Sequence, residues 1–135
     1  MVPNLNANLL GGRTRSQMAT KVRYANNFHG PFTDIHDVSF TSSGGPLLVF
    51  FNGSAYGSTS GRVLHLCLRF DSAFEPGCGI VAENEPLSHK ALASVPAQVS
   101  IPAGVHTFSI VDASGTTSSD AYDYYSVFIL EIAPA

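Results

Sequence analysis

Five histidines are the side chains of this sequence best suited to bind a metal ion or to transfer a proton. Metal sites usually gather His, Cys and carboxylate ligands at short spacing, and a cupin-type site needs two histidines one residue apart. No such His-x-His pair occurs, and His65 and His106 fall inside predicted strands. We therefore predict no metal ion and no other cofactor. We expect His65 and His106 to lie on a sheet face or at a subunit contact.

Nucleophilic and carboxylate chemistry has equally little support. The sequence contains no Gly-x-Ser-x-Gly elbow, and no serine can be assigned a base that is held by a third group. Glu83 and Glu85 flank Asn84 and could direct oxygen atoms at a calcium ion, but a solvated loop before Pro86 is the simpler interpretation. We predict that the protein is not an enzyme.

The two cysteines, Cys67 and Cys78, lie eleven positions apart around a predicted hairpin loop. A disulfide between them is geometrically possible, but spacing alone does not establish one. Because Cys67 falls inside a strand with alternating apolar residues, we expect two packed free thiols rather than a disulfide.

Two loops combine small hydroxyl residues with a tyrosine, at residues 55–60 and 113–122. An aromatic ring beside adaptable hydrogen-bonding groups suits the recognition of a sugar or a protein, although simple loop filler has the same composition. Both interpretations stay open. The candidate ligand-binding residues are Tyr56, Ser58, Thr59, Thr116, Thr117, Asp120 and Tyr122.

The composition excludes several classes of function. Charged residues make up 13% of the chain, against roughly 25% in an average soluble domain. The net charge is −3 without a basic stripe, which disfavours nucleic-acid binding. No apolar run approaches the roughly 20 residues of a membrane span, and the N-terminus lacks a basic-then-apolar signal. Low charge is typical of rigid extracellular or virion proteins, so we expect the protein to reach the outside within a virion.

Strand signals dominate the chain. Residues 62–70 alternate cleanly, with Leu64, Leu66 and Leu68 on one face, and only residues 14–20 could form a helical turn. About eight strands separated by turn residues predict an all-β antiparallel sandwich. The other strand-like stretches are residues 37–41, 47–51, 79–82, 91–101, 105–111 and 122–132.

The last predicted strand is apolar on both sides, and the strand over residues 47–51 is two-sided as well. One side of the last strand carries Tyr124, Phe128, Leu130 and Ile132, and the other carries Tyr125, Val127 and Ile129. A two-layer sandwich buries only one face of each sheet. Since no helix is available as a cover, another subunit is the simplest one.

The beginning of the chain resembles a segment that precedes the heads of phage tail fibres, Asn4-Leu5-Asn6-Ala7-Asn8-Leu9-Leu10-Gly11-Gly12. The rest resembles the trimeric jelly-roll heads of the tumour necrosis factor-like class, in the versions found at the ends of phage and bacterial fibres. The resemblance spans residues 4–132. The matching stretches, such as Ile101-Pro102-Ala103-Gly104-Val105-His106-Thr107-Phe108, are residues 38–50, 54–56, 88–92, 101–108 and 124–131.

The resemblance implies a jelly-roll domain over residues 23–135 and an attachment arm over residues 1–22, in which Leu5, Asn6, Leu9 and Leu10 contact a larger particle. In this family, aromatic and aliphatic side chains of the inner sheet line a threefold axis. This implies either a trimer interface on the side of the last strand that carries Tyr125, or one on its opposite side. The interface residues we predict are Tyr124, Tyr125, Val127, Ile129, Phe51 and Val49.

Together these observations lead us to expect a non-enzymatic phage virion protein, a homotrimeric fibre head or receptor-binding module. Its expected partners are its own copies, a capsid, tail or fibre shaft, and a glycan or protein on the host surface. Because little of the sequence precedes the arm, a capsid decoration protein attached through that arm is one alternative. A bacterial surface lectin and a small β-sandwich enzyme are the others.

Overall fold

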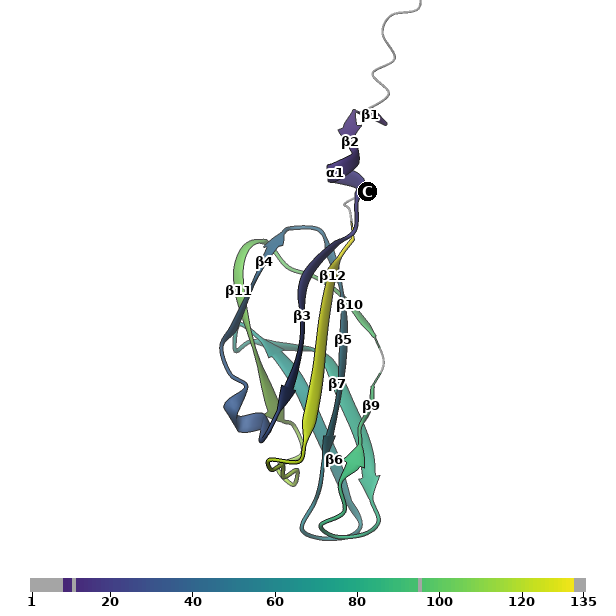
Figure 1. Ribbon diagram of the computed structural model, residues 1–135, viewed down its shortest axis with the longest axis vertical. Helices are drawn as coiled ribbons and strands as arrows, with labels where there is room; N and C mark the ends of the chain where they lie inside the picture. Colours follow the sequence, from purple (N-terminus) through teal and green to yellow (C-terminus); the bar gives the residue numbers. More distant parts are fainter. Residues whose placement is uncertain (1–8, 11, 95, 133–135) are drawn as a thin grey trace, which may run out of the picture.

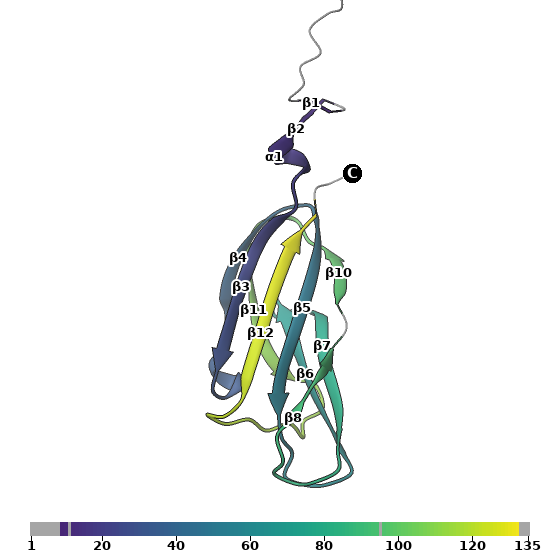
Figure 2. The ribbon, with the colours of Figure 1, turned by 45° about the vertical axis from the view of Figure 1, so that its right-hand side comes forward.

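The computed structural model describes residues 9–10, 12–94 and 96–132, and it contains two antiparallel sheets packed face to face (Figure 1). The first sheet has the order β10-β5-β12-β3, with β8 paired to β5, and the second has the order β4-β11-β6-β7-β9. The predicted all-β antiparallel sandwich is therefore confirmed. Figure 2 shows β3, β12 and β5 side by side across the first sheet.

The strands of the first sheet are β3 (Lys21–His29), β5 (Pro46–Ala55), β8 (Lys90–Ala91), β10 (Ala97–Ser100) and β12 (Tyr124–Glu131). Those of the second are β4 (Val38–Ser43), β6 (Arg62–Phe70), β7 (Phe74–Glu83), β9 (Ala93–Ser94) and β11 (Ala103–Asp112). Within the described part of the chain there is one 3₁₀ turn, η1 (Phe32–Asp34), which lies between β3 and β4.

The core lies between the sheets and follows the two-residue period of the strands. The alternation of β6 is confirmed, since Leu64, Leu66 and Leu68 are fully buried. From β11, Phe108 joins this layer and contacts the ring of Tyr24 edge-on, with centroids 4.9 Å apart. Burial of these apolar side chains is the main source of stability of such a sandwich.

The structure corrects most of the predicted trimer interface. The side of β12 that carries Tyr125 faces the core, and five of the six predicted interface residues are at most 2% exposed within a single chain, so they cannot contact a second one. Tyr124 points the other way and is 47% exposed. The sequence could not choose between the sides because both are apolar. The five buried residues are Val49, Phe51, Tyr125, Val127 and Ile129.

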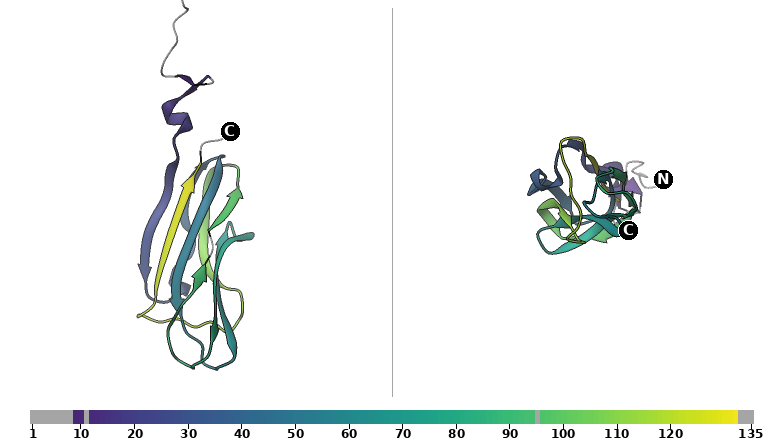
Figure 3. Two further views of the ribbon diagram at one scale, coloured as in Figure 1. Left: turned by 90° about the vertical axis from the view of Figure 1, so that its right-hand side faces the viewer. Right: turned by 90° about the horizontal axis from the view of Figure 1, so that it is seen from below.

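The N-terminal segment extends beyond one end of the sandwich (Figure 3). It contains the short hairpin β1 (Leu9–Leu10) and β2 (Arg13–Thr14), followed by α1 (Arg15–Met18). A capping box holds this turn, because the Thr14 hydroxyl accepts from the Gln17 amide and the Gln17 side chain accepts from the Thr14 amide at 2.7 Å. The predicted helical turn is confirmed. Leu5 and Asn6 lie outside the described residues.

Candidate functional site

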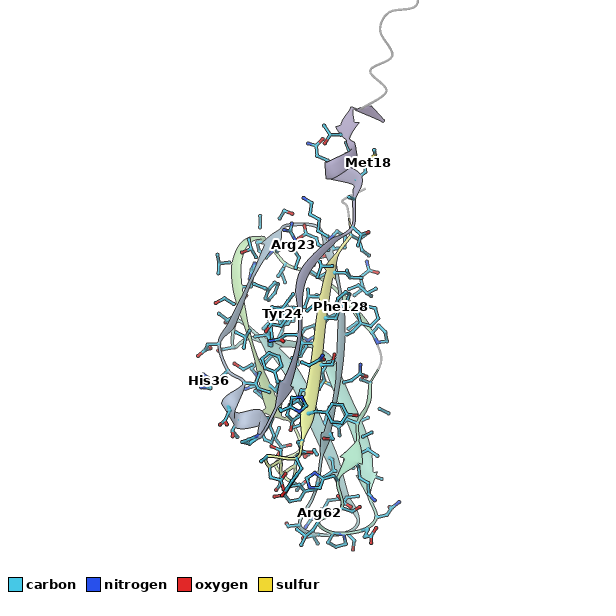
Figure 4. The ribbon with its side chains drawn as sticks, in the orientation of Figure 1. Met18, Arg23, Tyr24, His36, Arg62 and Phe128 are labelled. Atoms are coloured by element: carbon cyan, nitrogen blue, oxygen red, sulfur yellow. A yellow bond between two sulfur atoms is a disulfide. The ribbon has the colours of Figure 1, made fainter. Side chains whose placement is uncertain are left out.

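The end of the sandwich away from the arm gathers the loops in which recognition was predicted. Figure 4 labels Met18 in the arm and Arg62, which follows the β5–β6 loop, at opposite ends of the molecule. The loop between β11 and β12 also closes at the Arg62 end (Figure 1). We call the side chains of Tyr56, His89, Asp120, Tyr122 and Asp123 at this end the loop-end cluster.

A short β-bridge joins the two loops. The Tyr56 amide donates to the Ser118 carbonyl at 3.0 Å, and the Ser118 amide donates back to the Tyr56 carbonyl at 2.8 Å. Residues more than sixty positions apart thus form one surface. This pairing could not be read from the sequence, because neither loop carries a pattern that specifies a partner.

Asp123 is the centre of the loop-end cluster. Its carboxylate is fully buried, and it accepts hydrogen bonds from the Ser54 hydroxyl at 2.6 Å and from the Asp120 amide at 2.9 Å. The Nδ1 atom of His89 lies 2.9 Å from the same carboxylate. A buried carboxylate is stable when it is paired and hydrogen-bonded in this way. Asp123 therefore fixes the positions of β5, the 84–89 loop and the 113–122 loop relative to each other.

His89 lies at the partly exposed edge of the cluster. The hydrogen bond to Asp123 raises the pKa of His89, and the nearby Asp120 carboxylate acts in the same direction against partial burial. Its Nε2 atom is 3.5 Å from Asp120, and its ring contacts that of Tyr56 with centroids 4.9 Å apart. About a third of the side chain (35%) is exposed. Nothing in the sequence singles out His89 beyond its place in a loop beside Lys90.

The cluster offers charged groups and hydrogen bonds to a ligand, and its serine is not placed as a nucleophile. A serine nucleophile would need its hydroxyl on the imidazole, whereas the Ser54 hydroxyl donates to the Asp123 carboxylate. One ligand atom each from His89, Asp120 and Asp123 lies within 4.8 Å of the others, a spacing that would suit a cation. The hydrogen bonds of Asp123 already use both of its oxygens.

The remaining predicted loop residues divide into exposed and structural ones. Tyr122 is 87% exposed, and Ser58 and Thr59 are also exposed. Thr117 is buried and accepts from the His65 amide at 2.9 Å, so its predicted ligand-binding role is wrong. Thr116 is half-buried, and its hydroxyl donates to the Val63 carbonyl. The hydroxyl groups of this loop therefore include some that hold the loop in place by hydrogen bonds to the backbone of β6.

Glu83 stabilises the neighbouring loop from beneath. Its carboxylate is buried and accepts from the Gly57 amide at 2.9 Å and from the Glu85 amide at 3.0 Å. A Cβ at position 57 would lie 3.1 Å from Leu64 and 3.2 Å from Glu83, which explains the glycine there. The carboxylate thus has a structural role in place of the calcium ligation considered above.

The outward face of the first sheet is a second candidate surface. Phe128 is opposite Phe50 in the ladder, with ring centroids 6.1 Å apart, and Leu130 is opposite Leu48. A depression of about 330 Å³ adjoins Phe128 between β3 and β12. None of the described residues assigned to this face is an Asp, Glu, Lys or Arg, and its one histidine, His29, is opposite Tyr124 at the end of β3. The outward face consists of Val22, Ala25, Asn27, His29, Pro46, Leu48, Phe50, Asn52, Gln98, Ser100, Tyr124, Ser126, Phe128 and Leu130.

The two cysteines differ from expectation, and the strand histidines agree with it only in part. Cys67 and Cys78 are directly opposite each other on β6 and β7 and form a disulfide, so the prediction of free thiols is wrong. His65 lies on the outward side of β6, as expected, with Nε2 3.4 Å from the Cys67 sulfur. His106 is buried and lies between Asp71 and the Pro102 carbonyl.

Comparison of the chain with known protein families, with curated proteins and with solved structures found no match. Within the described residues, no helix combines the length and apolarity needed to cross a membrane.

Proposed function

We propose that this chain is a non-enzymatic, homotrimeric jelly-roll head of a phage virion. Its arm attaches to the particle, and its loop-end cluster binds a receptor on the host. The observation that carries the proposal is the largely apolar outward face of the first sheet, which has no Asp, Glu, Lys or Arg among its described residues and extends between the arm and the loop end.

The pairing of the long strands supports the jelly-roll assignment. In chain order, the first of the eight principal strands pairs with the last (β3 with β12), the second with the seventh (β4 with β11), the third with the sixth (β5 with β10) and the fourth with the fifth (β6 with β7). This is one long hairpin rolled into two sheets, because successive pairs alternate between the sheets. A hairpin wound in this way is the pattern expected of a jelly roll.

The outward face supports self-association in particular. Phe50, Phe128 and Leu130 are large, partly exposed apolar side chains on a sheet face that no described helix or strand covers, and apolar surface patches commonly mark interfaces. Side chains near a threefold axis meet their own copies, so a charge there would face like charges. A face without Asp, Glu, Lys or Arg avoids this repulsion. This surface replaces the buried set that was predicted from the sequence.

The loop-end cluster supports a recognition role. Tyr122 presents an exposed aromatic ring, while His89 and Asp120 offer an imidazole and a carboxylate on loops that Asp123 holds in place. Such a mixture of rigid aromatic and polar groups suits a glycan or a protein surface. Its position at the end opposite the arm would direct it away from the particle.

Two measurements test the proposal. Sedimentation equilibrium of the full chain at micromolar concentration should give three times the chain mass, and a monomer would contradict the proposed assembly. Deletion of residues 1–20 should abolish binding to virion particles while host-cell binding persists. If host binding is absent from both forms and only particle binding is seen, the chain acts as a capsid decoration protein instead.

A further inference from the structure

Three side chains with soft or borderline ligand atoms meet on the outward side of the second sheet. His65 and Cys67 are two residues apart on β6 and therefore share a face, and Cys78 on β7 is opposite Cys67 in the ladder. One ligand atom from each lies within 4.8 Å of the others. We call these three residues the thiol–imidazole cluster.

The strands hold this cluster in place. β6 is paired with β11 on one side and β7 on the other, so the backbone that carries His65 and Cys67 is fixed by two ladders. The His65 amide donates to Thr117 at 2.9 Å, and its carbonyl accepts from Ala113 at 2.8 Å. The imidazole has no hydrogen-bond partner other than Cys67 among the described residues. Its ring is therefore available to a ligand.

The disulfide blocks the cluster in the structure as it stands, because each sulfur is bonded to the other. A dithiol reductant would transfer two electrons and two protons, giving two thiols on the protein and a disulfide on the reductant. A divalent metal ion would then replace the two thiol protons, which are released to solvent. Reduction thus converts a cross-link into a set of potential metal ligands.

We propose that the reduced chain binds one Zn²⁺ ion through the thiolates of Cys67 and Cys78 and through Nε2 of His65, with water in the fourth position. Thiolate and imidazole ligands favour Zn²⁺ over hard cations such as Ca²⁺ and Mg²⁺. Bond lengths of about 2.3 Å to sulfur and about 2.0 Å to nitrogen place neighbouring tetrahedral ligands about 3.5 Å apart. The Nε2–Sγ distance of 3.4 Å already matches that separation.

The consequence is a site that depends on the redox compartment. In a reducing cytoplasm the chain would hold zinc, and in an oxidising exterior the same residues would form the disulfide. Zinc would then be released when the disulfide forms. This inference does not depend on the assembly proposed above.

The test uses the full chain, reduced by a phosphine under anaerobic conditions and then titrated with Co²⁺ as a spectroscopic probe and with Zn²⁺. We expect one ion per chain, a thiolate-to-cobalt charge-transfer band and the strong visible bands of a tetrahedral site. About two protons should be released per Zn²⁺ bound. The oxidised chain should show none of these signals.

Variants identify the ligands. Cys67→Ser with Cys78→Ser should abolish the charge-transfer band, and His65→Ala should weaken Zn²⁺ binding beyond the about 10–100-fold typical of changes outside the ligand shell. His36→Ala, which removes an exposed histidine, is the matched control and should bind normally.

Three results would overturn the inference. They are a reduced chain with no charge-transfer band, a His65→Ala variant that binds Zn²⁺ as tightly as the parent, and a reduced chain that loses its far-ultraviolet sheet signal even with Zn²⁺ present.

Discussion

His106 and Asp71 form a charged pair at the edge of the core, with Nδ1 of the histidine 2.7 Å from the Asp71 carboxylate. The second ring nitrogen, Nε2, lies 2.9 Å from the Pro102 carbonyl. A carboxylate and a carbonyl can only accept hydrogen bonds, so both ring nitrogens must carry a proton. The imidazolium form of His106 therefore joins the β6–β7 turn to the start of β11.

This pair makes stability depend on pH in two directions. The hydrogen bond to Asp71 raises the pKa of His106 despite partial burial, with support from the Pro102 carbonyl. Burial alone would raise the pKa of Asp71, but hydrogen bonds from His106 and from the Thr107 amide lower it. The histidine contribution is complete below about pH 6.5 and is lost as pH rises through the raised pKa. The aspartate contribution is present above about pH 3.9 and is lost on acidification.

We therefore expect the free energy of unfolding, measured with urea at about pH 5.5 and at increasing pH, to fall once the pH exceeds about 6.5. His106→Gln should cost about 1 kcal/mol at the lower pH, a modest value because Asp71 is 42% exposed and partly screened. The variant should also flatten the pH dependence, leaving the part due to His89, whose pKa is raised as well. His36→Ala should leave the profile unchanged, and an unaltered slope in His106→Gln would contradict the assignment.

The strands could be predicted because their signal is local. The alternation of Leu64, Leu66 and Leu68 depends only on which side of β6 faces the core, and the structure has that side buried. On β12, the local pattern does not indicate whether the side with Tyr125 or the side with Phe128 faces the core, because both sides of the strand are apolar. Which side is covered depends on the position of the second sheet, which is a long-range property.

The disulfide and the loop-end cluster could not be predicted for a related reason. The Cys67–Cys78 bond requires the two residues to be opposite each other, and ladder register depends on the length and shape of the turn between them. Asp123 and His89 are 34 positions apart, and only the packing of their loops brings them to 2.9 Å. Isolated polar residues carry no sequence signal for such a contact.

Glu131 should anchor the end of β12 through its charge. The carboxylate is 3% exposed and accepts from Arg23 at 2.6 Å, from the Ser43 amide at 3.0 Å and from the Gly45 amide at 3.1 Å. Burial opposes ionisation, but these hydrogen bonds outweigh it and lower the pKa of Glu131 to about 2. The stabilisation is therefore present above about pH 4.3 and is lost as pH falls towards 2.

Glu131→Gln should lower the free energy of unfolding at neutral pH by about 3 kcal/mol and reduce the loss of stability between about pH 4.5 and pH 2. Urea denaturation followed by circular dichroism across this range measures both effects. Glu85→Gln changes a carboxylate that is 76% exposed and should behave like the parent. Equal stability of the two variants would show that Glu131 is not an anchor.

Tyr122 should carry receptor binding without contributing to the fold. Its side chain is 87% exposed, so Tyr122→Ala should change the free energy of unfolding by no more than about 0.5 kcal/mol. An aromatic anchor at an interface is commonly worth about 2 kcal/mol, which corresponds to about 30-fold weaker binding. Binding of labelled protein to host cells and to a glycan array measures the loss. Val105→Ala removes another exposed apolar side chain, on β11, and should bind normally. Unchanged binding by Tyr122→Ala would contradict the proposal that the loop end binds the receptor.

Phe128 should determine the oligomeric state, because it lies in the middle of the largely apolar outward face of the first sheet and is opposite Phe50. Phe128→Lys would place like charges close together in a trimer built around this face, and their repulsion and desolvation should dissociate it. Light scattering at micromolar concentration should then give the mass of one chain, with the far-ultraviolet spectrum of the sandwich preserved.

Val105→Lys is the matched control, since it adds the same charge at an exposed position of the second sheet, where the trimer model places no contact. The control should remain trimeric. Phe50→Lys offers an independent test on the neighbouring strand, in case the Phe128 variant is too unstable to measure. Trimers in both phenylalanine variants would locate the interface elsewhere. Loss of the trimer in the Val105 variant alone would assign the trimer interface to the second sheet. The outward face of the first sheet would then contact something other than a copy of the chain.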